Sequence, residues 1–136
     1  MTSKTKKGKS AQLSLKDAFE VEFARREMER RDREEAERKQ QEADLAAAER
    51  LLGILKSDEA FLAKHQLTVD RRRYTVSLDH ADYRIQAYFE AGQANVTAAD
   101  KRTTVPGSVA PRKQLKVDSI EEALKTMAQF LVDESL

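Results

Sequence analysis

Apolar residues recur at helical spacing from Leu15 onwards, and nothing before Lys56 interrupts a helix. Ser14, followed three residues later by Asp17, forms a shortened capping box that marks where this helix begins. The segment holds no proline and a single glycine. The pattern therefore predicts one uninterrupted helix of roughly forty residues.

The predicted helix changes character along its length. Its first turns carry an N-terminal patch of four apolar residues, Leu15, Phe19, Val21 and Phe23. From Arg25 to Asp44 charged residues dominate, and glutamates stand four residues before a basic residue. Such pairs stabilise a helix in water by about 0.2–0.5 kcal/mol each. The predicted pairs are Glu22–Arg26, Glu27–Arg31, Glu29–Arg33, Glu34–Arg38 and Glu35–Lys39.

Apolar spacing resumes in the last part of the helix, at Leu45, Ala48, Leu52 and Leu55. These four residues would form the coiled-coil seam of a homodimer, although the seam covers only about a heptad and a half. Three interpretations of the helix stay open: a free spacer, half of a dimer seam, or an appendage that a partner buries. A fourth is packing within the chain, which needs the helix to fold back near Gly53.

After a short helix over residues 58–65, the hydrophobic period changes from helical to alternating. Alternation predicts strands over 73–78, 83–89 and 94–98, and their short connections indicate an antiparallel meander. Ser119 and Glu122 form a capping box that opens a final helix. The apolar stripe of that helix, which is expected to cover one face of the sheet, comprises Ile120, Leu124, Met127, Ala128 and Leu131.

These elements predict the α+β class, with a long charged N-terminal helix and a small α-β-β-β-α domain. The domain holds a three-stranded antiparallel meander with a C-terminal helix packed on it. We divide the chain into a disordered basic tail at 1–12, a charged extended helix at 13–44 and a small domain at 45–136. Within the domain, residues 100–114 hold both prolines and are expected to form a flexible basic loop.

Composition narrows the function classes. Charged residues make up 36% of the chain, yet 25 basic and 24 acidic residues leave a net charge of only +1, which excludes a polycationic protein of the histone type. The absence of cysteine excludes disulfide frameworks, Cys-type zinc sites and thiol catalysis. No apolar run approaches the roughly 18 residues of a membrane span, and no apolar signal core follows the basic start. We expect a cytoplasmic protein that does not bind membranes.

Positive charge is concentrated locally in the tail, in an arginine run and in the predicted loop. The candidate nucleic-acid contacts are Lys4, Lys6, Lys7, Lys9, Arg71, Arg72, Arg73, Lys101, Arg102, Arg112 and Lys113. Together they could present a phosphate-facing surface, so an RNA- or ribosome-associated factor is the alternative function. The opposing interpretation is a solvated strand whose arginines pair with nearby aspartates.

The element order α-β-β-β-α resembles that of double-stranded-RNA-binding domains. That family holds phosphates with lysines at the start of its last helix. Here the corresponding residues are Ser119-Ile120-Glu121-Glu122, and their two carboxylates would repel phosphates. The resemblance is therefore limited to the order of the elements, and we do not assign the chain to that family.

One short motif combines an imidazole with carboxylates, Asp79-His80-Ala81-Asp82. Three neighbouring residues in a turn rarely converge on one metal ion without a further ligand, so a polar hairpin turn is the favoured interpretation. No Gly-x-Ser-x-Gly frame and no glycine-rich phosphate loop occurs. We expect no catalytic residues, no metal and no cofactor, although an enzymatic pocket around His80 is the third class to test.

The leading hypothesis is a non-enzymatic adaptor or assembly protein. Two phenylalanines in a charged helix are exposed unless something covers them. An amphipathic helix that lies in a partner's hydrophobic groove is the expected mode of binding. We therefore expect a protein partner, with a homodimer and RNA as the alternatives.

Overall fold

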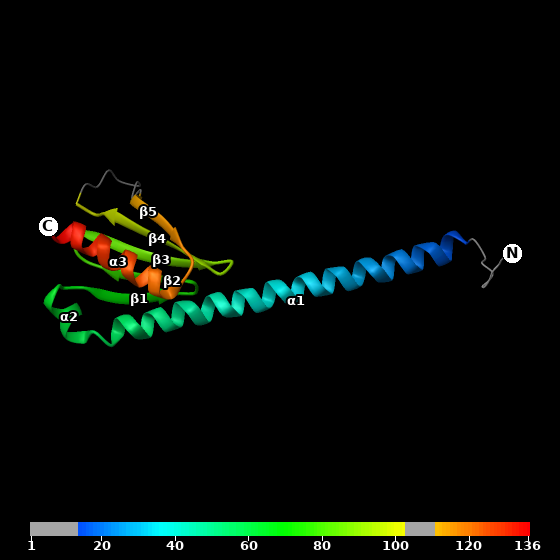
Figure 1. The fold of residues 1–136 in the computed structure, drawn as a ribbon, viewed down its shortest axis with the longest axis horizontal. Coiled ribbons are helices and arrows are strands. Elements are labelled where there is room, and N and C mark those ends of the chain that lie inside the picture. Colours follow the sequence, from blue (N-terminus) through cyan, green and yellow to red (C-terminus); the bar gives the residue numbers. More distant parts are fainter. Residues whose placement is uncertain (1–13, 103–110) are drawn as a thin grey trace. The chain divides into compact units, whose positions relative to one another are not determined.

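The computed structural model describes residues 14–102 and 111–136 (Figure 1). The elements are α1 (Leu15–Lys56), α2 (Glu59–Lys64), β1 (Thr68–Arg72), β2 (Thr75–Asp79), β3 (Tyr83–Glu90), β4 (Gln93–Asp100), β5 (Pro111–Val117) and α3 (Ile120–Ser135). The predicted α+β class is confirmed, since a long N-terminal helix precedes an antiparallel sheet with a C-terminal helix packed on it. The predicted tail at 1–12 lies outside the described residues.

The chain divides into two compact units, residues 1–38 and 39–136. The boundary falls within α1, after Arg38. It lies there because Asp44 and the helical turns that follow it are already buried in the second unit. Each unit is described by itself below.

In the first unit, α1 begins as predicted, with the backbone N–H of Asp17 donating to Ser14 Oγ at 3.2 Å. Its charged residues form ion pairs, but the partners differ in part from the predicted ones. Arg25 and Arg30, which were absent from the predicted pairs, each bridge two glutamates, three residues before and four residues after them. Of the predicted pairs, Glu22–Arg26 is present at 2.8 Å. Exposed pairs of this kind exchange at little energetic cost, so spacing alone does not select one set.

The second unit contains a five-stranded sheet in the order β1-β2-β3-β4-β5, with every neighbouring pair antiparallel. The three predicted strands correspond to β2, β3 and β4. The prediction of only three strands was wrong, because β1 and β5 add one strand at each edge. Residues 111–114, predicted as part of the loop, belong to β5, while residues 103–110 lie outside the described part of the chain.

The core lies on one face of the sheet. Side chains of β3 alternate between buried and less buried positions, and Tyr83, Ile85, Ala87 and Phe89 are the buried ones. Helix α3 packs against β3, β4 and β5 (Figure 1), and its predicted capping box is confirmed by a 3.0 Å bond to the hydroxyl of Ser119. The C-terminal part of α1 belongs to the same core cluster.

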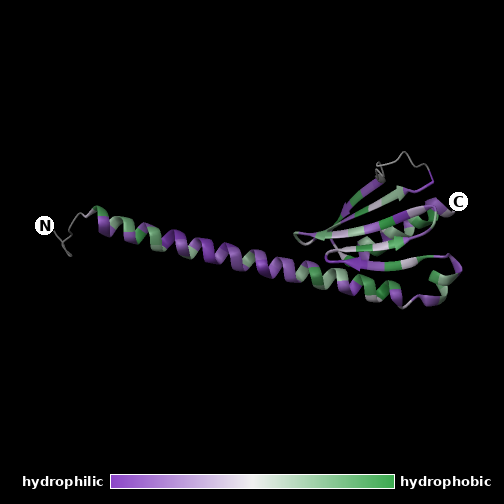
Figure 2. Cartoon of the chain, turned by 180° about the vertical axis from the view of Figure 1, so that it is seen from behind, coloured by the Kyte–Doolittle hydropathy of each residue, from purple (hydrophilic) through white to green (hydrophobic). Residues whose placement is uncertain are grey.

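Figure 2 shows how α1 changes from a hydrophilic middle to an apolar C-terminal part. Ala48, Leu51 and Leu55 are buried in the core, and Leu52 packs against it. Two residues of the predicted homodimer seam, Ala48 and Leu55, are therefore buried in the chain's own core. The helix also continues through Gly53, so the predicted alternative of a fold-back at this glycine is wrong.

Candidate functional site

The N-terminal patch lies on the first turns of α1, and all four of its residues are exposed. An α-helix turns by about 100° per residue, so Leu15, Phe19 and Phe23 lie within about 80° of one another. Val21 lies about 160° from the middle of that group, on the other side of the helix. The structure thus brings three of the four predicted residues together. We call Leu15, Phe19 and Phe23 the anchor stripe.

The anchor stripe is a continuous apolar ridge. Its residues are 88%, 62% and 56% exposed in chain order. The rings of Phe19 and Phe23 stack with their centroids 5.7 Å apart. Stacking of this kind holds the two rings side by side, as one apolar surface.

Charged side chains surround the anchor stripe. Glu22 accepts hydrogen bonds from Arg25 and Arg26, at 3.2 and 2.8 Å from their Nε atoms. The hydrogen bonds from these two arginines lower the pKa of Glu22 from its ordinary value to about 2. The pairs therefore stay ionised at neutral pH, and they favour a helix that needs no buried face of its own.

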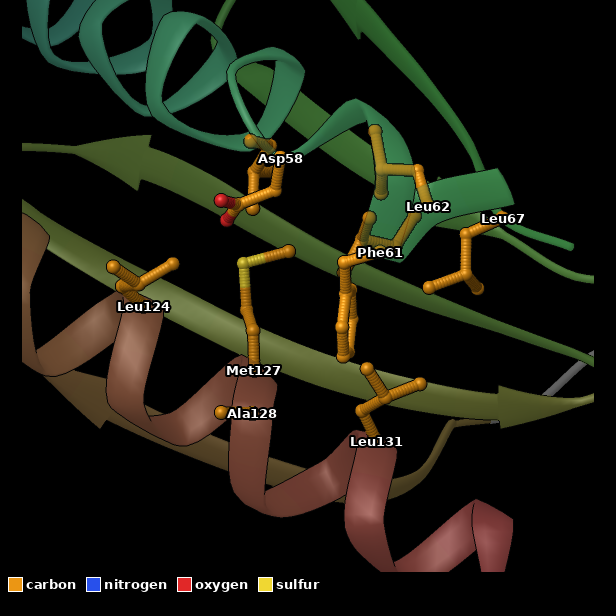
Figure 3. Close-up of a pocket in the computed structure, with 10 residues that line it drawn as sticks. Asp58, Phe61, Leu62, Leu67, Leu124, Met127, Ala128 and Leu131 are labelled. Atoms are coloured by element: carbon orange, nitrogen blue, oxygen red, sulfur yellow. The ribbon is translucent and has the colours of Figure 1, made fainter. Parts of the chain in front are cut away.

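The second unit holds an apolar groove that the sequence did not reveal (Figure 3). We call it the α2–α3 groove. Its volume is about 340 Å³ and nine of its ten lining residues are apolar: Leu55, Phe61, Leu62, Leu67, Leu78, Leu124, Met127, Ala128 and Leu131, with Asp58 as the tenth. Phe61 and Met127 point toward one another across it (Figure 3). The groove is formed by residues far apart in the sequence, so no local pattern could predict it.

Among the described residues, Asp58 is the only charged one that lines the α2–α3 groove. It occupies the N-cap position of α2, yet its side chain makes no capping hydrogen bond there. Asp58 lines the groove together with Leu124 and Met127 of α3 (Figure 3). The groove therefore combines an apolar lining with one anionic group.

The arginine run does not form one surface. Residues 71 and 72 lie in β1, where successive side chains point to opposite faces. The side chain of Arg71 is 27% exposed and lies 3.6 Å from Glu49, whereas that of Arg72 is 90% exposed and lies 3.6 Å from Asp70. The guanidinium of Arg73 lies over the ring of Tyr74 instead.

The basic residues of the predicted loop whose side chains the structure describes also lie beside carboxylates. Lys101 is 3.0 Å from Asp79, and Arg102 bonds Asp100 at 3.0 Å and Glu134 at 2.9 Å. Lys113 lies 2.6 Å from Asp133 on α3. The tail lysines and the side chain of Arg112 lie outside the described part. Within that part, the candidate phosphate contacts other than Arg73 are placed as members of ion pairs.

His80 closes a polar turn. Its Nδ1 accepts a 3.0 Å hydrogen bond from the backbone N–H of Asp82, and its ring stacks on Tyr83 with centroids 4.5 Å apart. In the described ranges, no group of three His, Cys, Asp or Glu side chains is placed to hold a metal ion. The geometry fits the interpretation of this motif as a turn.

The sheet face opposite the helices is polar, and its side chains largely bond one another. Gln86 donates to Ser77 Oγ at 3.0 Å, and Arg84 bonds Asp79 at 2.7 Å. Antiparallel sheets commonly leave one face in water. The polar groups of these two pairs are therefore satisfied within the described sheet.

Comparison with protein-family models, with curated proteins and with solved structures gives no significant match. Among the described residues, no helix is long and apolar enough to cross a membrane. A functional inference must therefore come from the chemistry of the surfaces themselves. Two of them are apolar and exposed, the anchor stripe and the α2–α3 groove.

Proposed function

We propose that this chain is a non-enzymatic adaptor or assembly protein that binds a protein partner through the anchor stripe. The observation that carries the proposal is the exposure of Leu15, Phe19 and Phe23 on one side of a helix. Large apolar side chains grouped in this way are typical of interaction sites. A cytoplasmic location is part of the proposal.

The charged network around the stripe supports this function by favouring the helix before binding. A segment that must fold when it binds loses conformational entropy at that step, which weakens the complex. Here Arg25 and Arg30 each bridge two glutamates along α1. The stripe is thus presented on a helix that is already formed.

The spacing of the stripe indicates how a partner would recognise it. Residues at i, i+4 and i+8 form one side of a helix, the arrangement that fits an apolar groove on a second protein. Aromatic residues often dominate the energy of such contacts. We expect Phe19 and Phe23 to contribute most of the binding energy, with Leu15 at one end.

We do not propose the RNA-associated alternative as a second function. Phosphate binding needs cations that point the same way and are not already neutralised. In the described part of the chain, Arg71 and Arg72 lie on opposite faces of β1, and Lys101, Arg102 and Lys113 lie beside carboxylates.

The test compares full-length chains in a pull-down with identification of the retained proteins. Phe19→Ser combined with Phe23→Ser removes the stripe, and Val21→Ser combined with Met28→Ser is the matched control. Val21 and Met28 are also exposed, but they lie on the other side of the helix. We expect the amount of each partner retained by the first variant to fall at least tenfold relative to the wild type. The control should retain the same amount as the wild type. Equal retention by the two variants would overturn the proposal.

A further inference from the structure

We infer that the turn between β2 and β3 is a proton-controlled switch, in which His80 binds the backbone of Asp82 when neutral and its carboxylate when protonated, and that Lys101 moves with the turn. The switch is independent of the proposed function, because it involves neither the anchor stripe nor the α2–α3 groove. We call residues 80–82 the histidine turn.

The neutral ring of His80 closes the histidine turn. The backbone N–H of Asp82 donates a 3.0 Å hydrogen bond to Nδ1 of this ring. A backbone N–H can only donate, and an imidazole nitrogen accepts only while it carries no proton. The observed bond therefore belongs to the neutral ring with its proton on Nε2, and it must break when Nδ1 takes up a proton.

The protonated ring has a second partner within the same turn. Oδ2 of the Asp82 carboxylate lies 3.9 Å from Nδ1 of His80. A small rearrangement would bring this oxygen within hydrogen-bond distance of a protonated Nδ1. Hydrogen bonds between charged groups are shorter and stronger than neutral ones. One proton thus exchanges a bond to the backbone of Asp82 for a bond to its side chain, and the protonated turn has a defined arrangement of its own.

The ring of His80 is held in place by its surroundings. It stacks on the ring of Tyr83, with centroids 4.5 Å apart and planes 10° from parallel. Tyr83 is buried, and the side chain of His80 is only 18% exposed. Because the ring is fixed on this side, the backbone of residues 81 and 82 has to take up the change of partner.

Three contacts tie the histidine turn to Lys101, the residue that follows β4. The backbone N–H of Lys101 donates to the carbonyl of Asp82 at 2.9 Å. Its ammonium donates to the carbonyl of His80 at 2.9 Å and lies 3.0 Å from Oδ1 of Asp79. Two of these contacts end on the residues whose mutual bond breaks on protonation. A displacement of the turn therefore changes the surroundings of Lys101.

Other titratable and charged groups surround the turn from several elements. These are Asp79 and Asp82 beside the ring, Tyr83 and Arg84 on β3, Asp100, Lys101 and Arg102 at the end of β4, and Glu134 on α3. Burial would raise the pKa of Asp79, but hydrogen bonds from Arg84 and Lys101 outweigh it and hold this pKa below its ordinary value. Among these residue types, histidine is the one that ordinarily changes charge near neutral pH.

The test is an NMR titration of the full chain from alkaline into acidic solution. Imidazole ¹⁵N resonances show which nitrogen carries the proton, and the carbon-bound ring protons give the midpoint of the His80 titration. We expect the neutral ring to carry its proton on Nε2. The backbone amide resonances of Asp82 and Lys101 should shift with the same midpoint as the ring, whereas that of Gln86, within β3, should not.

Hydrogen exchange measures the loss of the bond itself. The protection factor of the Asp82 amide should fall about fivefold or more across that midpoint, as expected for the loss of one hydrogen bond. A protection factor is already corrected for the intrinsic effect of pH on exchange. Its fall therefore reports the opening of the histidine turn.

Two variants assign these changes to His80. His80→Phe keeps an aromatic ring beside Tyr83 but takes up no proton, so both amide shifts at that midpoint should vanish. His65→Phe is the matched control, because His65 is the other of the two histidines in the sequence, and it should retain both shifts. Thermal unfolding checks that the variants are folded. If His80→Phe is not, His80→Gln replaces it, since glutamine also lacks a titrating ring.

Four results would overturn the inference. The first is a neutral ring that carries its proton on Nδ1. The second is an Asp82 amide that does not shift at the midpoint of the ring, and the third is a shift that persists in the folded His80 variant. In the fourth, Asp82 shifts but Lys101 does not, which would refute the coupling that the switch requires.

Discussion

The backbone N–H of Gly92 donates a 3.0 Å hydrogen bond to Oδ1 of Asp44, a residue 48 positions earlier in the chain. Oδ2 of the same carboxylate accepts a 3.0 Å bond from the backbone N–H of Ala91, and Gln40 donates to Oδ1 at 3.1 Å. Asp44 is only 6% exposed. One buried carboxylate thus fastens α1 to the turn between β3 and β4.

Replacing this carboxylate should strongly destabilise the second unit. Asp44→Ala removes charge-assisted hydrogen bonds and leaves two backbone N–H groups without their acceptor, so we expect a loss of about 3 kcal/mol in the free energy of unfolding. Urea denaturation measures the change. Gln41→Ala, at an exposed neighbouring position, should change stability by less than about 0.5 kcal/mol. Similar losses in the two variants would show that the carboxylate has no special role.

Substitutions at the two residues of the turn that Asp44 binds should have opposite effects on the stability of the second unit. Glu90 pairs with Gln93, so Ala91 and Gly92 form a two-residue turn, and both have positive φ, +53° and +80°. A type I′ turn of this length favours Asn followed by Gly. Ala91→Asn should therefore raise stability by about 0.5–1 kcal/mol.

Gly92→Ala should lower stability by about 1–2 kcal/mol, because an L-residue is strained at this φ. Space is not the cause, since an added Cβ would lie 3.7 Å from Gln40 Nε2, an ordinary contact. Thermal or urea unfolding of the two single variants provides the measurement. A loss of stability in both would mean that the Asp44 contact, and not the backbone preference, dominates this turn.

The helices and the central strands could be predicted because their hydrophobic periods are intact. The edge strands could not, because edge positions carry charge that discourages pairing with other chains. In β1, the charged residues Arg71 and Arg72 interrupt the alternation of apolar and polar residues by which a strand is predicted. Lys113 and Lys116 interrupt it in β5. Of the charges that looked like a phosphate-binding surface, Arg71, Arg72, Arg112 and Lys113 thus belong to strands at the edges of the sheet.

The candidate site was predictable to a smaller extent. Phe19 and Phe23 stand out in the sequence because their neighbours are charged, whereas Val21 was grouped with them on proximity in sequence and not on helical geometry. The α2–α3 groove combines Leu55 with residues as distant as Leu131. Its shape depends on tertiary packing, which cannot be predicted from the hydrophobic periodicity of any one segment.

The buried and exposed leucines of α1 should respond differently to truncation. Leu51 is fully buried in the core, and Leu51→Ala should cost about 2–5 kcal/mol in the free energy of unfolding through lost contacts and a residual cavity. Leu15→Ala changes an exposed residue of the same type and should cost less than about 0.5 kcal/mol. Denaturation of both variants measures the two changes in the free energy of unfolding. A large loss for Leu15→Ala at low protein concentration would place that residue in the core instead.

The ion pairs near the anchor stripe make its helix sensitive to acid. The pKa of Glu22 is lowered to about 2 by hydrogen bonds from Arg25 and Arg26. In an unfolded chain a glutamate titrates at about 4.3. Because the folded pKa is the lower one, these bonds stabilise the helix fully above about pH 4.3, and their contribution is lost as the pH falls through about 2.

Carboxyl ¹³C NMR of the full chain should therefore give a midpoint for Glu22 near pH 2, and backbone shifts of residues 15–38 should report loss of helix over the same range. Arg25→Gln combined with Arg26→Gln should move the midpoint upward, toward that of an unfolded chain, because both donors to the charged carboxylate are gone. Arg33→Gln, a change on the same helix away from Glu22, serves as the control and should leave the midpoint in place. If wild type titrated like an unfolded glutamate, the network would not be formed in solution, and the helix would need its partner in order to persist.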